Sequence, residues 1–282
     1  MQERLYLFNM KGKELEKIVD KYLRSLEKYC RNIPGSFTVE DIHELRVGYK
    51  RLRAFLRLCS EDPRARHLEI PEPLSEVYRA AGAVRDLQLF ISNITLFAKV
   101  HFLLPEFAKC MNHQLFKAKE QLVKKIEKVD WDKVSKSIKQ ELPSHLGDSI
   151  IRQFVNRNVA GIHILQLAAE REKDLHDVRK KLKDLLLVNR VFEHDWGISF
   201  PFPPWKNEKQ VNVLAEKLGE FNDECIGQTY LYDDCSNNLP EDENEKLDIW
   251  RRMQADLVKQ EMKRLMQAVQ QLQLEAIPVP VK

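Results

Sequence analysis

Apolar residues recur at spacings of three and four over most of the chain, a periodicity that predicts long amphipathic helices. Prolines, glycines and short polar loops divide this pattern into eight helical segments. We expect helices at residues 12–31, 38–59, 74–100, 105–131 with an extra turn to 141, 148–171, 174–193, 208–232, and from beyond 240 to 274. Pro143 and Gly147 mark a hinge with four helices on each side. The pattern therefore predicts an all-α protein.

Cationic side chains follow the second and the sixth predicted helix in the same arrangement. The first stripe is His43, Arg46, Lys50, Arg53 and Arg57, and the second is His176, Arg179, Lys183 and Arg190. Each stripe comes one residue after the apolar positions of its helix, which is about 100° around the axis. The cations thus flank the apolar seam, where packed helices form the wall of a groove. We expect the two copies to build one site for a polyanion.

A basic helix face is in most proteins a solvated surface, and three features favour a binding site here. The stripe occurs twice, and it borders the apolar seam in both copies. Few acids stand four residues away to neutralise it, since Glu44 lies beside the first stripe without pairing along it.

A second motif supports an internal repeat. Gly82-Ala-Val-Arg-Asp86 in the third predicted helix matches Gly219-Glu-Phe-Asn-Asp223 in the seventh. The separation from the stripe histidine to the aspartate is 43 residues in the first copy and 47 in the second. We therefore expect a single domain over residues 1–282 with two repeats, 1–144 and 145–282. Each repeat is expected to be an antiparallel four-helix bundle, related to the other by a pseudo-twofold axis, with a central basic groove or pore.

Composition and charge sharpen this picture. Of the 282 residues 43% are hydrophobic and 32% charged, and the net charge is +3. Residues 43–57 carry five cations and one acid, and residues 176–190 carry five cations and two acids. The rest of the chain is therefore slightly acidic, so that the positive potential is concentrated at the two stripes and attracts anions there.

Other chemistry is less well supported by the sequence. No apolar run reaches the roughly 20 residues of a membrane span, and we expect no signal peptide. The five cysteines are scattered without a C-x-x-C motif, so we expect neither a disulfide framework nor a zinc site, but a reducing, cytoplasmic location. Neither stripe histidine has a second ligand at a suitable spacing. We expect no metal and no cofactor.

The motif Asp41-x-His43-x-x-Arg46-x-x-x-Lys50-Arg51-x-Arg53, followed by Gly82-x-x-Arg85-Asp86, resembles the conserved histidine α-helical domain family, abbreviated CHAD. The second copy does so too. The resemblance implies two four-helix bundles around a basic groove or pore that binds inorganic polyphosphate. It implies that His43, Arg46, Lys50, Arg53, Arg57, His176, Arg179, Lys180, Lys183 and Arg190 line the site, with Arg51 and Arg85 as further candidates. The second copy departs from the first at Asp184, Leu186 and Asn222.

The resulting hypothesis is a stand-alone, non-enzymatic protein that binds inorganic polyphosphate. One alternative is nucleic-acid binding, which should place stacking aromatics beside the cations, where only Tyr49 and Phe55 are near. Another phosphorylated ligand is a further alternative. A phosphohydrolase, or an accessory module of one, is less favoured because no Gly-rich loop occurs and the acids of residues 241–245 are expected in a solvated loop. The last alternative is a protein scaffold that is bound through the aromatic loop 200–205. No membrane partner is expected.

Overall fold

The computed structural model describes residues 8–65, 68–237 and 239–278, and within these ranges the chain is mainly helical. The helices are α1 (Gly12–Ser36), α2 (Val39–Cys59), α3 (Glu72–Val100), α4 (Pro105–Ile126), α5 (Trp131–Gln140), α6 (Asp148–Ala168), α7 (Glu172–Arg190), α8 (Glu208–Tyr230) and α9 (Glu241–Gln270). The described residues also contain three short helical turns, η1 (Pro63–Ala65), η2 (Val191–Asp195) and η3 (Asp234–Ser236). They further contain two strands, β1 (Asn9–Lys11) and β2 (His145–Gly147).

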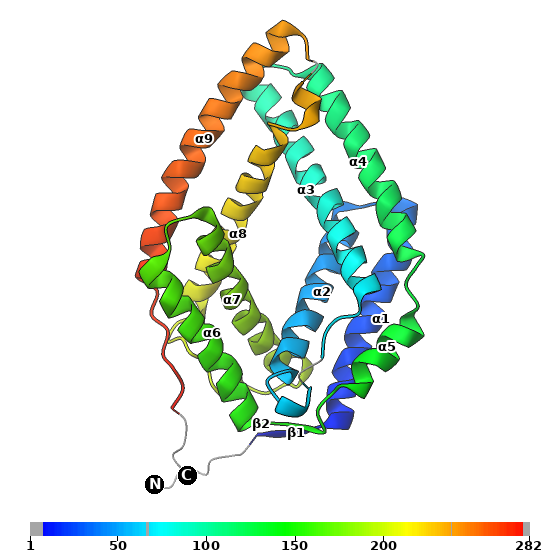
Figure 1. Cartoon of the computed structure of the whole chain (residues 1–282), viewed down its shortest axis with the longest axis vertical. Coiled ribbons are helices and arrows are strands. Elements are labelled where there is room, and N and C mark those ends of the chain that lie inside the picture. Colours follow the sequence, from blue (N-terminus) through cyan, green and yellow to red (C-terminus); the bar gives the residue numbers. More distant parts are fainter. Residues whose placement is uncertain (1–7, 66–67, 238, 279–282) are drawn as a thin grey trace.

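The helices form a flat, elongated molecule (Figure 1). In the first half α1 packs on α2, α2 on α3 and α3 on α4, and in the second half α6 packs on α7, α7 on α8 and α8 on α9. Helices α2 and α7 make contact across the two halves, as do α3 and α8. The packing order is thus the same in both halves, which brings the two stripe-bearing helices together. The two-bundle division and the twofold relation stay predictions.

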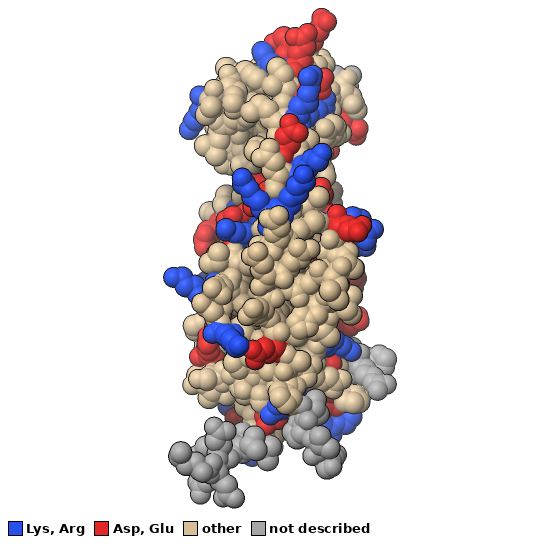
Figure 2. All heavy atoms as spheres, turned by 90° about the vertical axis from the view of Figure 1, so that its left-hand side faces the viewer, with Lys and Arg blue, Asp and Glu red and all other residues tan. Residues whose placement is uncertain are grey.

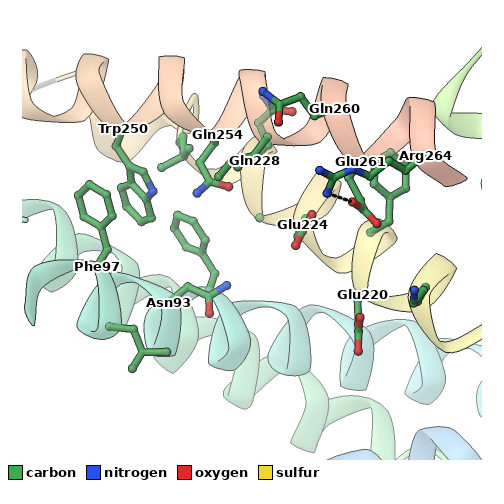
Figure 3. Close-up of a pocket in the computed structure, with 17 residues that line it drawn as sticks. Asn93, Phe97, Glu220, Glu224, Gln228, Trp250, Gln254, Gln260, Glu261 and Arg264 are labelled. Atoms are coloured by element: carbon green, nitrogen blue, oxygen red, sulfur yellow. Dashed lines mark hydrogen bonds and ion pairs between the residues drawn. The ribbon is translucent and has the colours of Figure 1, made fainter. Parts of the chain in front are cut away.

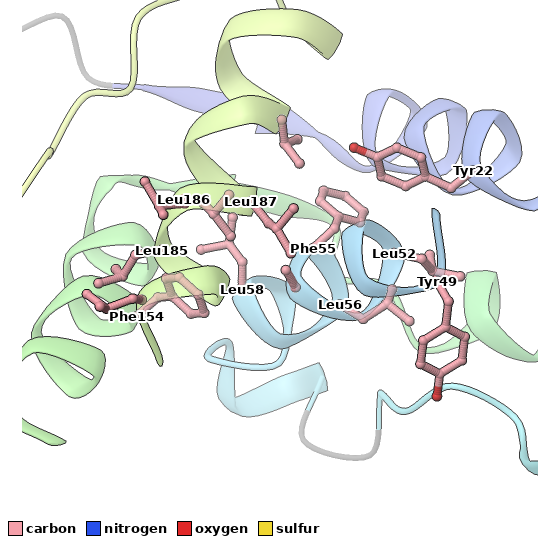
Figure 4. Close-up of a cluster of buried hydrophobic side chains, with 14 of the residues drawn as sticks. Tyr22, Tyr49, Leu52, Phe55, Leu56, Leu58, Phe154, Leu185, Leu186 and Leu187 are labelled. Atoms are coloured by element: carbon pink, nitrogen blue, oxygen red, sulfur yellow. The ribbon is translucent and has the colours of Figure 1, made fainter. Parts of the chain in front are cut away.

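Two hydrophobic clusters hold the helices. The larger cluster includes Phe55, Leu58, Phe154 and Leu185, and joins α2 to α6 and α7 (Figure 4). The smaller cluster lies where α3 and α4 meet α8 and α9, and it includes Phe90 and Trp250. Each fully buried Leu or Phe contributes roughly 1.5–3 kcal/mol relative to an exposed one. Both clusters contain residues from both halves, so neither half buries its apolar surface alone.

Segments near the two ends of the chain are tied to the second half. Strands β1 and β2 pair antiparallel, with Met10 opposite Leu146, although the sequence pattern predicted no strand. After α9 the chain runs along α6, where Asn156 exchanges two hydrogen bonds with the backbone of Ile277 at 2.7 and 2.9 Å. No helix within the described residues is both long enough and apolar enough to span a bilayer.

The predicted helix boundaries need four corrections. The first helix continues through Pro34 to Ser36 instead of ending at residue 31. The fourth helix ends at Ile126, because Asp130 caps a separate helix α5 by accepting the backbone N–H of Lys133 at 3.1 Å. The sixth continues beyond α7 as the π-type turn η2. The expected solvated acidic loop is instead the first turn of α9. There Glu243 is buried and accepts the backbone N–H groups of Glu106 and Phe107 at 3.1 and 3.2 Å, which satisfies the start of α4.

The structure contains one disulfide, although the scattered cysteines predicted no disulfide framework. Cys110 of α4 and Cys235 of η3 form a disulfide with a Cα–Cα distance of 5.7 Å and a sequence separation of 125 residues. Spacing along the sequence could not indicate this pair, because the packing of α4 on η3 brings the two residues together. The disulfide also removes the basis on which a reducing compartment was expected. Cys30, Cys59 and Cys225 are free.

Candidate anion-binding site

Five cations of the two stripes come together between α2 and α7. We call Arg46, Lys50, Arg53, Arg179 and Lys183 the central cluster. All five side chains are partly buried. The charges of Arg46, Arg179 and Arg53, from both helices, act on Lys50. The structure thus brings these five predicted residues, from both copies of the stripe, close to one another.

Burial makes the charge of the central cluster unfavourable in the absence of a ligand. It lowers the pKa of Lys50 to about 7, and the neighbouring arginines add to this effect. The pKa of Lys183 is also lowered, first by burial and then by Arg179 and Arg190. Burial is the main cause of a lowered pKa at Arg179 as well. The amines of the cluster thus lie in an environment that favours a bound anion.

No ion pair neutralises this cluster within the described residues. None of its five side chains has a carboxylate oxygen within 4.0 Å, whereas many lysines and arginines elsewhere on the surface do. The Nε atoms of Arg53 and Arg179 are buried without a hydrogen-bond partner in the described part of the chain. Asp86 and Asp223 are near enough to influence Arg46, Lys50 and Arg179 electrostatically, but not to pair with them. The cluster keeps a net positive charge.

The two glycines of the second motif make room for the arginines. Arg46 lies against Gly82 of α3 so closely that a Cβ at this position would overlap its guanidinium group. Arg179 lies against Gly219 of α8, where a Cβ would be 3.3 Å from its Nε atom. The motif and the stripe therefore act together in each half, because a glycine on one helix lets an arginine of the neighbouring helix approach it closely.

Tyr78 of α3 is a site residue that the sequence reasoning missed. Its ring stacks on Tyr49 with centroids 4.0 Å apart, and the guanidinium carbons of Arg46 and Arg53 lie 5.0 and 5.7 Å from its centroid. These cation–π contacts orient both arginines. The spacing could have indicated it, because Tyr78 stands four residues before Gly82 and thus on the same face of α3.

Of the remaining stripe residues, His176 and Arg190 lie near members of the central cluster. His43 is exposed in the first turns of α2. His176 lies beside Asn222 of α8, and its Nδ1 atom is buried without a partner in the described ranges. Burial, then the charge of Lys180, lowers the pKa of His176, which favours its neutral form. Arg190 is close enough to act on Lys183.

Other predicted residues point elsewhere. Arg57 forms an ion pair with Asp184 of α7, and Lys180 pairs with Asp177 at 3.0 Å. Both cations line a separate hollow of about 620 Å³ between the end of α2, α6 and α7.

Arg51 and Arg85 also lie apart from the five. Arg51 lies near Tyr22 of α1, and Arg85 lies near Asp86. No group of three or more His, Cys, Asp or Glu side chains suited to a metal ion occurs among the described residues.

The chain matches the family model of the CHAD domain over residues 17–232. This match covers most of the 282 residues, and the protein belongs to the CHAD domain family. The resemblance inferred from the two motifs is thereby confirmed. No curated protein matches the chain by sequence.

Two solved structures share the fold. One is the crystal structure of the CHAD domain from the plant Ricinus communis, with a TM-score of 0.68 and 15% identity, covering 94% of each chain. The other is PptA from Streptomyces chartreusis, with a TM-score of 0.61 and 10% identity, covering 93% of this chain and 100% of that one. At these identities the similarity shows the fold alone.

Proposed function

We propose that the protein binds inorganic polyphosphate, without catalysis, at the central cluster between α2 and α7. The observation that carries the proposal is that five partly buried cations from two helices have no ion pair within the described residues. Like charges held together in this way destabilise the free protein, and a bound polyanion removes the repulsion. Guanidinium groups donate paired hydrogen bonds to phosphate oxygens, and the lysines add point charges.

The arrangement favours an extended ligand. Arg46 and Arg53 lie seven residues apart on α2, roughly 10 Å along the helix at about 1.5 Å per residue. Arg179 and Lys183 extend the same positive surface onto α7, with Arg190 beyond them. A single phosphate contacts only part of such a surface, whereas a chain of phosphates reaches cations on both helices. We infer that the two repeats, 1–144 and 145–282, form two four-helix bundles with this basic groove between them.

The site is tested by titration of the full-length protein with polyphosphate, comparing wild type with the double variant Arg46→Ala, Arg179→Ala. The matched control is Arg57→Ala, Lys180→Ala, which removes the same number of cations from the separate hollow. We expect the first double variant to bind far more weakly and the control to retain most of the affinity. For a flexible polyanion the log–log salt dependence should have a slope of about −0.7 per phosphate neutralised. Equal affinity of wild type and Arg46→Ala, Arg179→Ala would show that the ligand binds elsewhere.

Two further measurements separate this function from its alternatives. Competition between polyphosphate and RNA tests nucleic-acid binding. Tyr49 is buried, and Tyr78 is stacked on it and contacted by two arginines, so neither of these two rings offers a free stacking face. Release of orthophosphate from polyphosphate in the presence of Mg²⁺ would contradict the assignment as a non-enzymatic binder.

A further inference from the structure

The two hydrophobic clusters leave an interval along α8 and α9. On α9, buried apolar side chains stop at Trp250 and resume at Val258, and on α8 they stop at Phe221 and resume just after the helix at Leu231. A hollow of about 410 Å³ lies along this interval between α3, α8 and α9. Figure 3 shows α9 along one wall, α3 along the other and α8 behind. Apolar side chains therefore do not fill the space between the facing sides of these three helices.

One end of the hollow is aromatic and holds an unused hydrogen-bond donor. The Trp250 indole stacks on Phe97 and Phe90, with ring centroids 4.4 and 5.8 Å apart. Only 3% of Trp250 is exposed, and its Nε1–H has no acceptor within the described residues. The indole nitrogen is turned toward the side of Gln254, along the hollow (Figure 3). A buried N–H of this kind requires an acceptor.

Carboxamide groups line the middle of the hollow. They belong to Asn93 of α3, Gln228 of α8, and Gln254 and Gln260 of α9. In the described part of the chain these side chains make no hydrogen bond to protein atoms. Each carboxamide has donors and an acceptor, as a peptide group has. A row of such groups suits a ligand with an amide backbone.

The other end of the hollow is acidic. Glu220 and Glu224 of α8 meet Glu261 of α9. Among the described residues that line the hollow, Lys217 and Arg264 are the cations that oppose the three carboxylates. Arg264 pairs with Glu261 at 3.4 Å (Figure 3). Burial, and then the charges of Glu261 and Glu220, raise the pKa of Glu224. The negative excess favours a cationic group at this end.

Exposed apolar side chains border the hollow on opposite walls. Leu96 of α3 is 56% exposed and Leu257 of α9 is 53% exposed. In the edge-on view the charged side chains are separated by wide areas without charge (Figure 2). A ligand with apolar side chains can cover the two leucines.

We propose that this hollow binds a short basic segment of a partner protein in an extended conformation. A Lys or Arg of the segment lies between the three glutamates, its backbone pairs with the carboxamide row, and one of its carbonyl groups accepts the Trp250 N–H. From Trp250 to Glu261 is eleven residues, roughly 16 Å of helix at about 1.5 Å per residue. This length matches about five residues of extended chain. A simple polyamine has no acceptor for the indole N–H. The proposal is independent of polyphosphate binding.

The test uses the full-length protein and two fluorescein-labelled pentapeptides, acetyl-Leu-Ala-Gly-Lys-Arg-amide and the same residues in reverse order. The two peptides cover both directions in which the segment can run along the hollow. Fluorescence polarisation measures the affinity. We expect Glu261→Gln to weaken binding about tenfold, the effect of one lost charge-assisted contact. Gly227→Leu should abolish binding, because the side chain extends into the hollow from α8. Gly227→Ala is the matched control, since a Cβ there meets only Phe90 Cδ2 at 3.6 Å.

Thermal unfolding by circular dichroism verifies that each variant folds. If Gly227→Leu does not fold, the affinity of Glu261→Gln alone tests the proposal. Absence of binding by both peptides would overturn the proposal, as would equal affinity for wild type and Glu261→Gln. If spermidine competes for the hollow as well as the unlabelled peptide does, the proposal is wrong and the occupant is a small organic cation. If the protein self-associates and Gly227→Leu blocks this self-association, the occupant of the hollow is a second copy of the chain and the proposal is wrong. Unchanged polyphosphate titrations in Gly227→Leu would support a site separate from the central cluster.

Discussion

Replacing Lys50 with methionine should stabilise the free protein while weakening its binding of polyphosphate. Burial and three arginines lower the pKa of this lysine from 10.5 to about 7. At about 1.4 kcal/mol per pKa unit, the charged amine costs the folded state at most about 5 kcal/mol. Solvent relaxation reduces this to about 1–3 kcal/mol, because effective dielectric screening in proteins is high. Methionine fills a similar volume without the charge.

The dependence of this gain on pH follows from the direction of the shift. Below pH 7 the amine is protonated in both the folded and the unfolded chain, so the penalty is fully present. Between pH 7 and 10.5 the folded chain releases the proton and the unfolded chain holds it, so the penalty shrinks as the pH rises. The stabilisation by Lys50→Met should thus be larger at about pH 6 than at about pH 9. The difference should be roughly half of the penalty, about 0.5–1.5 kcal/mol, because the penalty vanishes only near pH 10.5.

Urea unfolding at both pH values, without polyanion, measures this difference. Lys17→Met on the exposed face of α1 is the matched control, and should change the free energy of unfolding by less than about 0.5 kcal/mol. Polyphosphate favours the charged amine, so its affinity for wild type should also fall as the pH rises above about 7, and this fall should be smaller in Lys50→Met. A destabilised Lys50→Met, or a gain in stability that does not vary with pH, would refute the reasoning.

Three further predictions concern the neighbours of the cluster and the disulfide. Gly82→Ala should displace Arg46 and weaken polyphosphate binding, measured by titration, while the melting temperature stays the same or rises, because alanine favours the helix by about 1 kcal/mol. Tyr78→Leu should weaken binding by about 1–2 kcal/mol by releasing the arginines, and Tyr78→Phe, which keeps the ring, should bind like wild type. Replacing Cys110 and Cys235 by serine should lower the free energy of unfolding by about 2–5 kcal/mol in urea. A reductant should lower the free energy of unfolding of the wild type and leave that of the double serine variant unchanged.

The all-α fold and most helix positions could be predicted from the sequence, because apolar spacing and proline breaks are local signals. The contact between the two stripes needed the repeat as well, since only the second copy indicated that α2 and α7 face a common space. The short strands, the capping role of Glu243 and the disulfide depend on segments more than a hundred residues apart, and no local pattern carries them.

The candidate site was predictable only in part for a similar reason. Helical spacing places His43, Arg46, Lys50, Arg53 and Arg57 on one face, but it cannot say how far along that face the neighbouring helices extend. At the end of α2 the helix α7 presents Asp184, which pairs with Arg57 and directs it away from the other four. Burial and neighbouring charge, which distinguish Lys50 from an ordinary surface lysine, arise only once the helices pack.

The most direct test of the central claim is a crystal structure of the protein with a short linear polyphosphate. The phosphates should lie between α2 and α7, within hydrogen-bonding distance of Arg46, Arg53 and Arg179, with Lys50 and Lys183 alongside. Phosphates bound instead in the hollow that Arg57 and Lys180 line, with the central cluster unoccupied, would contradict the account.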